Sequence, residues 1–287
     1  MDTLVLKLVL TPALIGLISL AGRRWGHTVS GLLVGLPLTS GPLVFFVTLS
    51  QGASFATATA MGILAGTISQ AAFCVTYSRL AFRCGWVISF LLSSGVFIGF
   101  TLVLQAFTLP LVPLYVLVIL FLILALRLSS RNAAPVSQSV PPLPRWDIPA
   151  RILVATTYLV VLTSLAPTIG PHLTGLLSPF PLYAAILAVF AHHLQGPAPA
   201  VRVVNGLLAG LFGFATFFLV LSGLLPVVGT AVAFAAAILT VLFMQAAALW
   251  LLRRTARRQR LSSDLQLEAQ VISPGSAEFE TGSSANS

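Results

Sequence analysis

The chain has 287 residues, of which 57% are hydrophobic and only 7% are charged, and its formal net charge is +9. Soluble domains carry about a quarter charged residues, so this composition excludes a soluble domain and predicts an all-α polytopic membrane protein. In such a protein the excess of arginine predicts anchors that set membrane topology, and it does not predict a nucleic-acid partner.

A membrane-spanning helix needs about 20 apolar residues. By this length the sequence predicts nine spans, at residues 3–22, 28–50, 53–78, 85–107, 110–128, 151–169, 173–194, 199–222 and 226–252. A polar linker rich in Pro, Ser and Arg (129–150) separates the fifth span from the sixth. A basic tail without enough apolar residues to pack (253–287) follows the ninth.

The basic residues predict the orientation of these spans. Every Lys and Arg except Lys7 lies in or beside a connection that follows an odd-numbered span or the last span. Because cytoplasmic connections carry the excess of Lys and Arg, the N-terminus is expected outside and the C-terminus in the cytoplasm of a bacterial inner membrane.

Glycine and proline interrupt the second predicted span near its middle, at Gly35, Pro37 and Gly41. Proline removes an amide donor and frees carbonyl groups upstream, and in hydrocarbon such groups must find partners in protein or in a watery cavity. Thr39 and Ser40 bring hydroxyl groups to this break. All five residues are therefore candidates for a solute-binding site.

The stretch recurs farther along the chain, because residues 31–73 align without a gap with residues 175–217, at a spacing of 144. The identities include four glycine pairs and a proline pair, which chance matches between apolar segments rarely produce. A period of five spans turns the second copy upside down in the membrane. The predicted units are a four-helix repeat (1–108), a connector helix (109–128) and an inverted four-helix repeat (151–252).

The second copy of the break supplies Ser178, Pro181 and Tyr183 in the seventh span. In transporters with inverted repeats, sites lie where the interrupted helices meet near the bilayer centre. We therefore expect a two-sided binding crevice at the crossing of spans two and seven. The alternative is a pair of proline kinks with no ligand.

Four polar residues outside the breaks are further candidates. Gln70 and Asn205 lie in the spans that follow the broken helices, so they are candidate ligands; interhelical hydrogen bonding is the alternative. Gln51 and Gln195 close the broken helices and are candidate gates; the alternative is a simple helix stop made by the glycine that follows each.

No Asp or Glu lies within any predicted span. A buried carboxylate relay and a counter-charge for a cationic substrate are therefore missing, whereas the N-termini of half-helices favour negative charge. The sequence predicts a small organic solute that is anionic or neutral, with the lipid bilayer as surroundings and a homo-oligomer left open. It predicts no catalytic residues, metal or cofactor, since no catalytic or metal-binding motif is present.

The inverted units, with a Gly/Pro-broken helix in each, resemble carriers of the bile-acid/sodium symporter type and their bacterial relatives. This chain differs from them in span count and in lacking acidic residues at the crossing, so the resemblance does not extend to sodium coupling. The segments at 35–42 and 179–183 also resemble those of uncharacterised bacterial integral membrane proteins.

These patterns predict an inner-membrane secondary transporter, a permease that works by alternating access at the crossing. Two other functions stay open at this point. One is a non-transporting scaffold or accessory subunit; the other is a lipid flippase or membrane enzyme.

Overall fold

The computed structural model describes residues 32–37, 40–130 and 176–248 and ten single residues, at positions 13, 16, 17, 20, 24, 149, 152, 153, 157 and 250. Within these residues all regular structure is helical. The predicted spans one and six, the linker and the tail lie outside them, apart from single positions.

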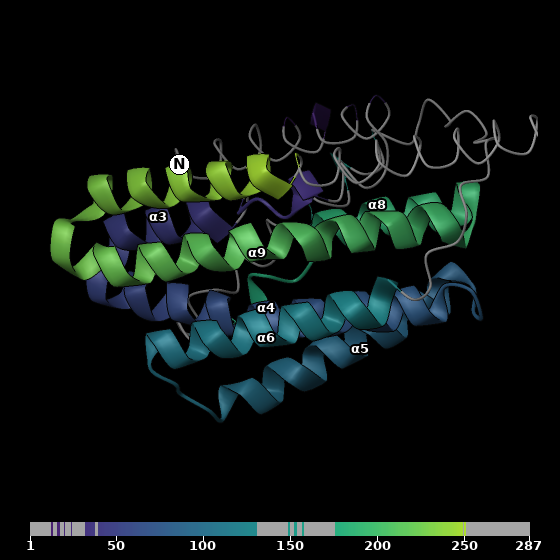
Figure 1. Cartoon of the computed structure of the whole chain (residues 1–287), viewed down its shortest axis with the longest axis horizontal. Helices are drawn as coiled ribbons and strands as arrows, with labels where there is room; N and C mark the ends of the chain where they lie inside the picture. Colours follow the sequence, from purple (N-terminus) through teal and green to yellow (C-terminus); the bar gives the residue numbers. More distant parts are fainter. Residues whose placement is uncertain are drawn as a thin grey trace, which may run out of the picture. The chain divides into compact units, whose positions relative to one another are not determined.

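Figure 1 shows the helices of the described part. They are α3 (Ser40–Gln51), α4 (Ala53–Leu80), α5 (Trp86–Gln105), α6 (Leu111–Ser130), α8 (Leu182–Gln195), α9 (Pro197–Val228) and an unlabelled helix, Thr230–Ala248. Every contact analysed below lies within Met1–Gln245, which form one compact unit; of the second unit, Ala246–Ser287, only the first residues and Trp250 are described.

Five of these helices are long and apolar enough to cross a membrane: α4, α5, α6, α9 and Thr230–Ala248. They coincide with the predicted spans three, four, five, eight and nine, and they indicate a membrane-embedded protein.

The boundary between the last two of these spans differs from the prediction. The sequence predicts, from the length of the apolar runs, that span eight ends at residue 222 and that span nine begins at 226. In the structure α9 continues through Pro226 to Val228. The chain turns only at Gly229, whose φ of 80° and ψ of 170° suit glycine alone.

α4 lies at the centre of the described bundle and contacts α3, α5, α6 and α9. Its buried residues include the polar side chains of Thr59, Thr67, Ser69, Gln70 and Ser78. By contrast, α5 and α6 expose leucine, valine and isoleucine along most of their length. Polar groups inside and apolar groups outside are the arrangement expected of helices in lipid.

Hydroxyl contacts show the directions of three central helices. Ser129, near the end of α6, lies within hydrogen-bond distance of both Ser78 near the end of α4 and Asn205 near the start of α9. At the other end of α6, Tyr115 bonds to Thr216 of α9 at 3.0 Å. α4 and α6 therefore run in one direction and α9 runs in the opposite one.

Backbone geometry repeats at a spacing of 144 residues. The recurring features are the bonds Leu36 N–Leu33 O (3.1 Å) and Phe180 N–Leu177 O (2.9 Å), the bonds Gly41 N–Pro37 O (2.9 Å) and Ala185 N–Pro181 O (2.6 Å), and the positive φ of Gly52 (86°) and Gly196 (90°). α4 and α9 occupy equivalent places in the two copies, and they run antiparallel. The same sequence pattern thus yields the same local backbone twice.

Candidate functional site

The first break separates a helical turn that ends at Val34 from α3, which begins at Ser40. The amide of Gly35 donates to the Leu32 carbonyl at 3.0 Å, which tightens the last turn. Pro37 has no amide hydrogen, so it cannot continue the helical ladder. The chain leaves the helix at Gly35 and resumes helical structure within a few residues.

Helix α9 covers this break through glycine. A β-carbon added to Gly35 would lie 2.5 Å from the Cα of Gly210, so the two backbones touch. The carbonyl of Leu32, which also accepts from the Gly35 amide, and the carbonyl of Gly210 each accept a hydrogen bond from the Gln245 amide, both at 3.3 Å. Protein groups therefore satisfy the first break.

The second break runs from Leu177 through Ser178 and Pro179 to the start of α8 at Leu182. It is covered by Gly66 of α4, the residue equivalent to Gly210. A β-carbon on Gly66 would lie 2.5 Å from Cγ of Pro179 and 2.9 Å from the Leu176 carbonyl oxygen. Each break is thus packed against a glycine of the long helix from the other copy.

The two breaks meet through a pair of buried serines. The Ser178 hydroxyl donates to Oγ of Ser40 at 2.9 Å, and the Ser40 hydroxyl donates to the Ser178 carbonyl at 3.4 Å. The exposed fraction of the side chain is 1% for Ser40 and 8% for Ser178. The structure therefore brings together two predicted site residues that are 138 positions apart.

The remaining predicted residues of the breaks lie around this pair. Gly41 follows Ser40 in α3. Pro37 lies shortly before α3 and is half-buried. In the second break, Pro181 is buried and Tyr183, in the first turn of α8, is 6% exposed. Thr39 lies outside the described residues.

Gln70 is buried on α4, with 5% of its surface exposed, and its Oε1 has no hydrogen-bond partner. The residue one turn before it, Gly66, touches the second break. Three residues after it, the ring of Phe73 lies 6.0 Å from the ring of Phe180. Since these positions share a helix face, Gln70 lies over the second break.

Asn205 occupies a different place. Its side chain accepts a hydrogen bond from Ser129 of α6, close to Ser78 of α4, so it makes the interhelical contact that was the alternative for this residue. Ser129 itself was missed, because the sequence places it in the polar linker, whereas α6 extends to Ser130. The signal in the sequence that could have indicated this contact was a hydroxyl side chain at the end of an apolar run.

The two gate candidates end α3 and α8. Gln51 is exposed and lies two residues before α4 begins. Gln195 ends α8, close to His192. Nδ1 of His192 lies 3.2 Å from the hydroxyl of Tyr77, near the end of α4. The glutamines therefore lie at opposite ends of α4. The glycine after each has a positive φ but an extended ψ, so neither is the αL stop that the sequence suggests. The gate role stays a prediction.

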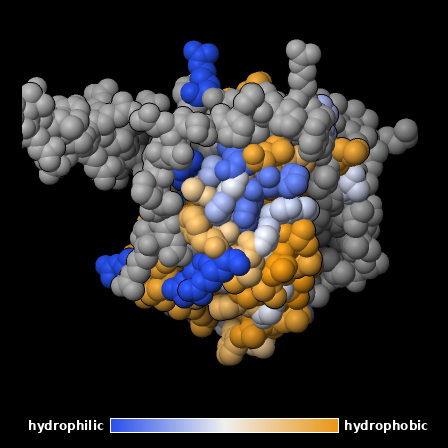
Figure 2. Space-filling model, turned by 90° about the vertical axis from the view of Figure 1, so that its right-hand side faces the viewer, coloured by the Kyte–Doolittle hydropathy of each residue, from blue (hydrophilic) through white to orange (hydrophobic). Residues whose placement is uncertain are grey.

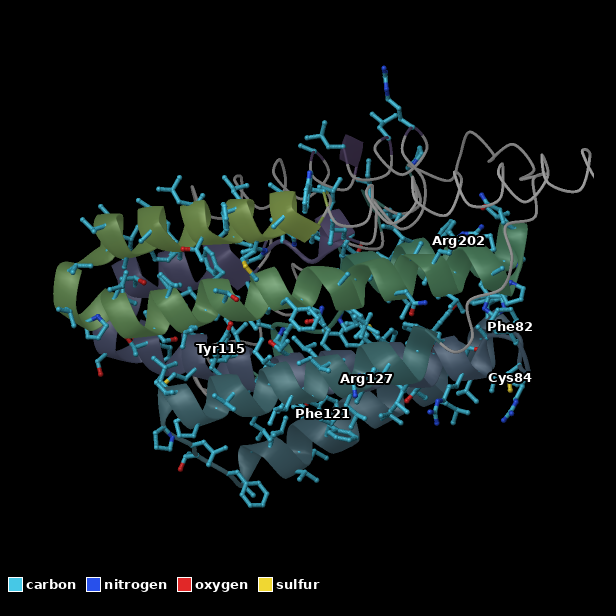
Figure 3. All side chains as sticks on the ribbon, in the orientation of Figure 1. Phe82, Cys84, Tyr115, Phe121, Arg127 and Arg202 are labelled. Carbon is cyan, nitrogen blue, oxygen red and sulfur yellow. The ribbon has the colours of Figure 1, made fainter. Side chains whose placement is uncertain are left out.

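Polar side chains gather at the end of the bundle where α8 meets α9. Arg202, Phe82 and Cys84 lie at this end (Figure 3). Figure 2 views the same end and shows hydrophilic side chains within apolar surroundings. Among the described residues there is no Asp or Glu and no cluster of three His, Cys, Asp or Glu that could hold a metal.

Comparison with protein-family models, with curated proteins and with solved structures finds no match. The resemblance to symporter-type carriers therefore stays an expectation.

Proposed function

We propose that this protein is a secondary transporter that moves a small anionic or neutral organic solute across the bacterial inner membrane. The observation that carries the proposal is the contact between Ser40 and Ser178, which joins the two interrupted helices. Interrupted helices that meet inside a membrane bundle are typical of carrier sites.

The proposal includes nine spans in two inverted repeats, with the N-terminus outside and the C-terminus in the cytoplasm. Two observations support the inversion: α4 and α9 are equivalent in sequence, yet they run in opposite directions, and each packs a glycine on the break of the other copy. The positions of the arginines support the orientation.

The charge balance supports the class of solute. α3 and α8 both begin beside the crossing, and the N-terminus of a helix carries partial positive charge and free amide donors. The described membrane helices contain no acidic side chain that could bind a cation. An anionic group, or a neutral group that accepts hydrogen bonds, fits such a site best.

The test is a solute screen. Labelled small metabolites are offered to inverted and right-side-out membrane vesicles made with and without the protein, and uptake is measured by mass spectrometry. Ser40→Leu removes a hydroxyl and adds volume at the crossing. We expect it to abolish the protein-dependent flux while the amount of protein in the membrane stays unchanged.

Ser54→Leu is the matched control, because Ser54 is exposed in the first turn of α4. It should leave the flux unchanged. Equal flux in the wild type and Ser40→Leu, or no protein-dependent flux for any metabolite offered, would overturn the proposal.

A further inference from the structure

Gln70 carries an inference that rests on the proposed function and deepens it. Gln70 is 95% buried, and its amide oxygen has no hydrogen-bond partner. Such an oxygen lowers the free energy of unfolding, because in water it would accept hydrogen bonds. Buried polar side chains in native proteins nearly always find a partner. Gln70 is one of the few exceptions among the described residues, and it lies over the break that contributes Ser178.

The second break explains why Gln70 Oε1 has no partner in the protein. Pro179 and Pro181 lack amide hydrogens. Of the neighbouring amides, that of Phe180 donates to the Leu177 carbonyl at 2.9 Å and that of Leu182 donates to the Phe180 carbonyl at 2.7 Å. The backbone that faces Gln70 therefore offers it no donor at these positions.

The same region also holds the N-terminus of α8, a helix of 14 residues whose first residue has no side-chain cap. Its partial positive charge attracts an anionic group and opposes a bare cation. Gln70 adds the complementary requirement, since its free oxygen accepts a hydrogen bond. A ligand that satisfies both carries a carboxylate and, close to it, a hydroxyl group.

We propose that the site at the second break binds a small hydroxycarboxylate, whose carboxylate faces the N-terminus of α8 and whose hydroxyl group donates to Oε1 of Gln70. Gln70 then determines specificity, because a carboxylate without the hydroxyl leaves the buried oxygen unpaired. In the empty protein the same oxygen is a source of instability.

The first test uses stability without any solute. Full-length wild type, Gln70→Met and the control Gln105→Met, at an exposed position that ends α5, are purified in detergent and melted. Methionine keeps the length of the side chain and removes the unpaired oxygen. We expect the melting temperature of Gln70→Met to equal or exceed that of the wild type. A lower melting temperature for Gln70→Met, with that of Gln105→Met unchanged, would show that Gln70 holds helices together. That result would overturn the proposal.

The second test uses matched probes: glycolate against acetate, and lactate against propionate, all as potassium salts at equal concentration. A ligand that binds only the folded protein raises its melting temperature. In the wild type we expect each hydroxy acid to raise it more than the plain acid does. Gln70→Met should bind glycolate about fivefold more weakly, as the loss of one hydrogen bond implies, and should erase the difference within each pair.

Equal shifts within each pair, or no shift with any of the four acids, would overturn the assignment. A shift caused by sodium chloride alone and lost in Gln70→Met would indicate a bound cation and would also overturn it. Flux separates this inference from the proposed function. Transport that depends on Ser40 but shows no preference for hydroxy acids rejects only the role of Gln70 in specificity. A preference for hydroxy acids in binding, without any flux, rejects only the transporter function.

Discussion

The two breaks follow the same backbone path but meet opposite chemical groups. At the first, the Gln245 amide adds a second donor to the Leu32 carbonyl, which also accepts from the Gly35 amide. At the second, Gln70 brings an acceptor oxygen that no group in the described part of the chain satisfies. In the repeat, Thr101 stands where Gln245 does and Phe214 stands where Gln70 does.

The two segments share some residues and differ at others. Proline is present at both Pro37 and Pro181, and glycine at both Gly52 and Gly196 and at both Gly66 and Gly210. By contrast, Pro179 stands where Gly35 does and Ala185 stands where Gly41 does. The polar side chains on the covering helices have diverged. The first break therefore faces an amide donor, whereas the second faces an amide oxygen, to which we assign ligand binding.

The largest expected effect is at the glycine contact of the first break. A β-carbon from Gly35→Ala would lie 2.5 Å from the Gly210 backbone, so two main chains would have to separate. We expect a loss of about 3 kcal/mol or more in the free energy of unfolding, or failure to accumulate, measured by size-exclusion chromatography and thermal melting.

Gly66→Ala tests the equivalent contact at the second break and should cost less, since its nearest backbone atom, the Leu176 carbonyl oxygen, would lie at 2.9 Å, whereas backbone atoms of Gly210 would lie at 2.5 and 2.7 Å from the β-carbon of Gly35→Ala. Gly99→Ala is the control, because a β-carbon there would meet nothing within 4 Å. If Gly35→Ala behaves like Gly99→Ala, the breaks are not held by glycine packing.

A smaller effect is expected at Gln245. Gln245→Met removes one hydrogen bond from each of the carbonyls of Leu32 and Gly210, although Leu32 keeps the bond from the Gly35 amide, so the change should cost about 1.5 kcal/mol of stability. The same substitution at Gln70 should cost nothing. Thermal melting of the two variants side by side checks the opposite roles, and equal losses would remove the distinction between the breaks.

The glycines that end α3 and α8 should behave alike. Gly52 and Gly196 have nearly the same φ and ψ, in a region that other residues rarely adopt. We expect Gly52→Ala and Gly196→Ala to lower stability by about 1 kcal/mol each. Melting curves that differ clearly between the two would show that the copies are not equivalent at these turns.

The smallest effect is expected from the serine pair. Ser178→Ala removes one hydrogen bond, but the Ser40 hydroxyl can still donate to the Ser178 carbonyl, so the cost should be below about 1 kcal/mol. Ser40→Ala removes both bonds and should cost more. Unfolding in denaturant compares them, and the reverse order would contradict the hydrogen-bond directions.

The sequence was sufficient to predict the positions of the described helices and of both breaks, because glycine, proline and apolar run length act locally. The inversion of the second copy stays a prediction, which the opposite directions of α4 and α9 support. The last boundary was less predictable, because a proline near a helix end leaves most of the ladder intact and α9 continues through Pro226 to Val228.

The partners of polar side chains were not predictable to the same degree. Whether Asn205 faces the crossing or α6 depends on the rotation of α9, which is set by packing with several helices at once. Gln70 and Asn205 look alike in sequence, yet the structure gives one a free oxygen and the other a hydrogen bond with Ser129.

Ser129 has a single hydroxyl proton, but both Ser78 and Asn205 lie within reach of its oxygen. It can donate to only one acceptor at a time, so the junction between α4, α6 and α9 has two bonding arrangements that interconvert by rotation about one C–O bond. Such a rotation needs no repacking of hydrocarbon. Exchange between the two arrangements at this end of the bundle therefore requires only a turn of the Ser129 hydroxyl group.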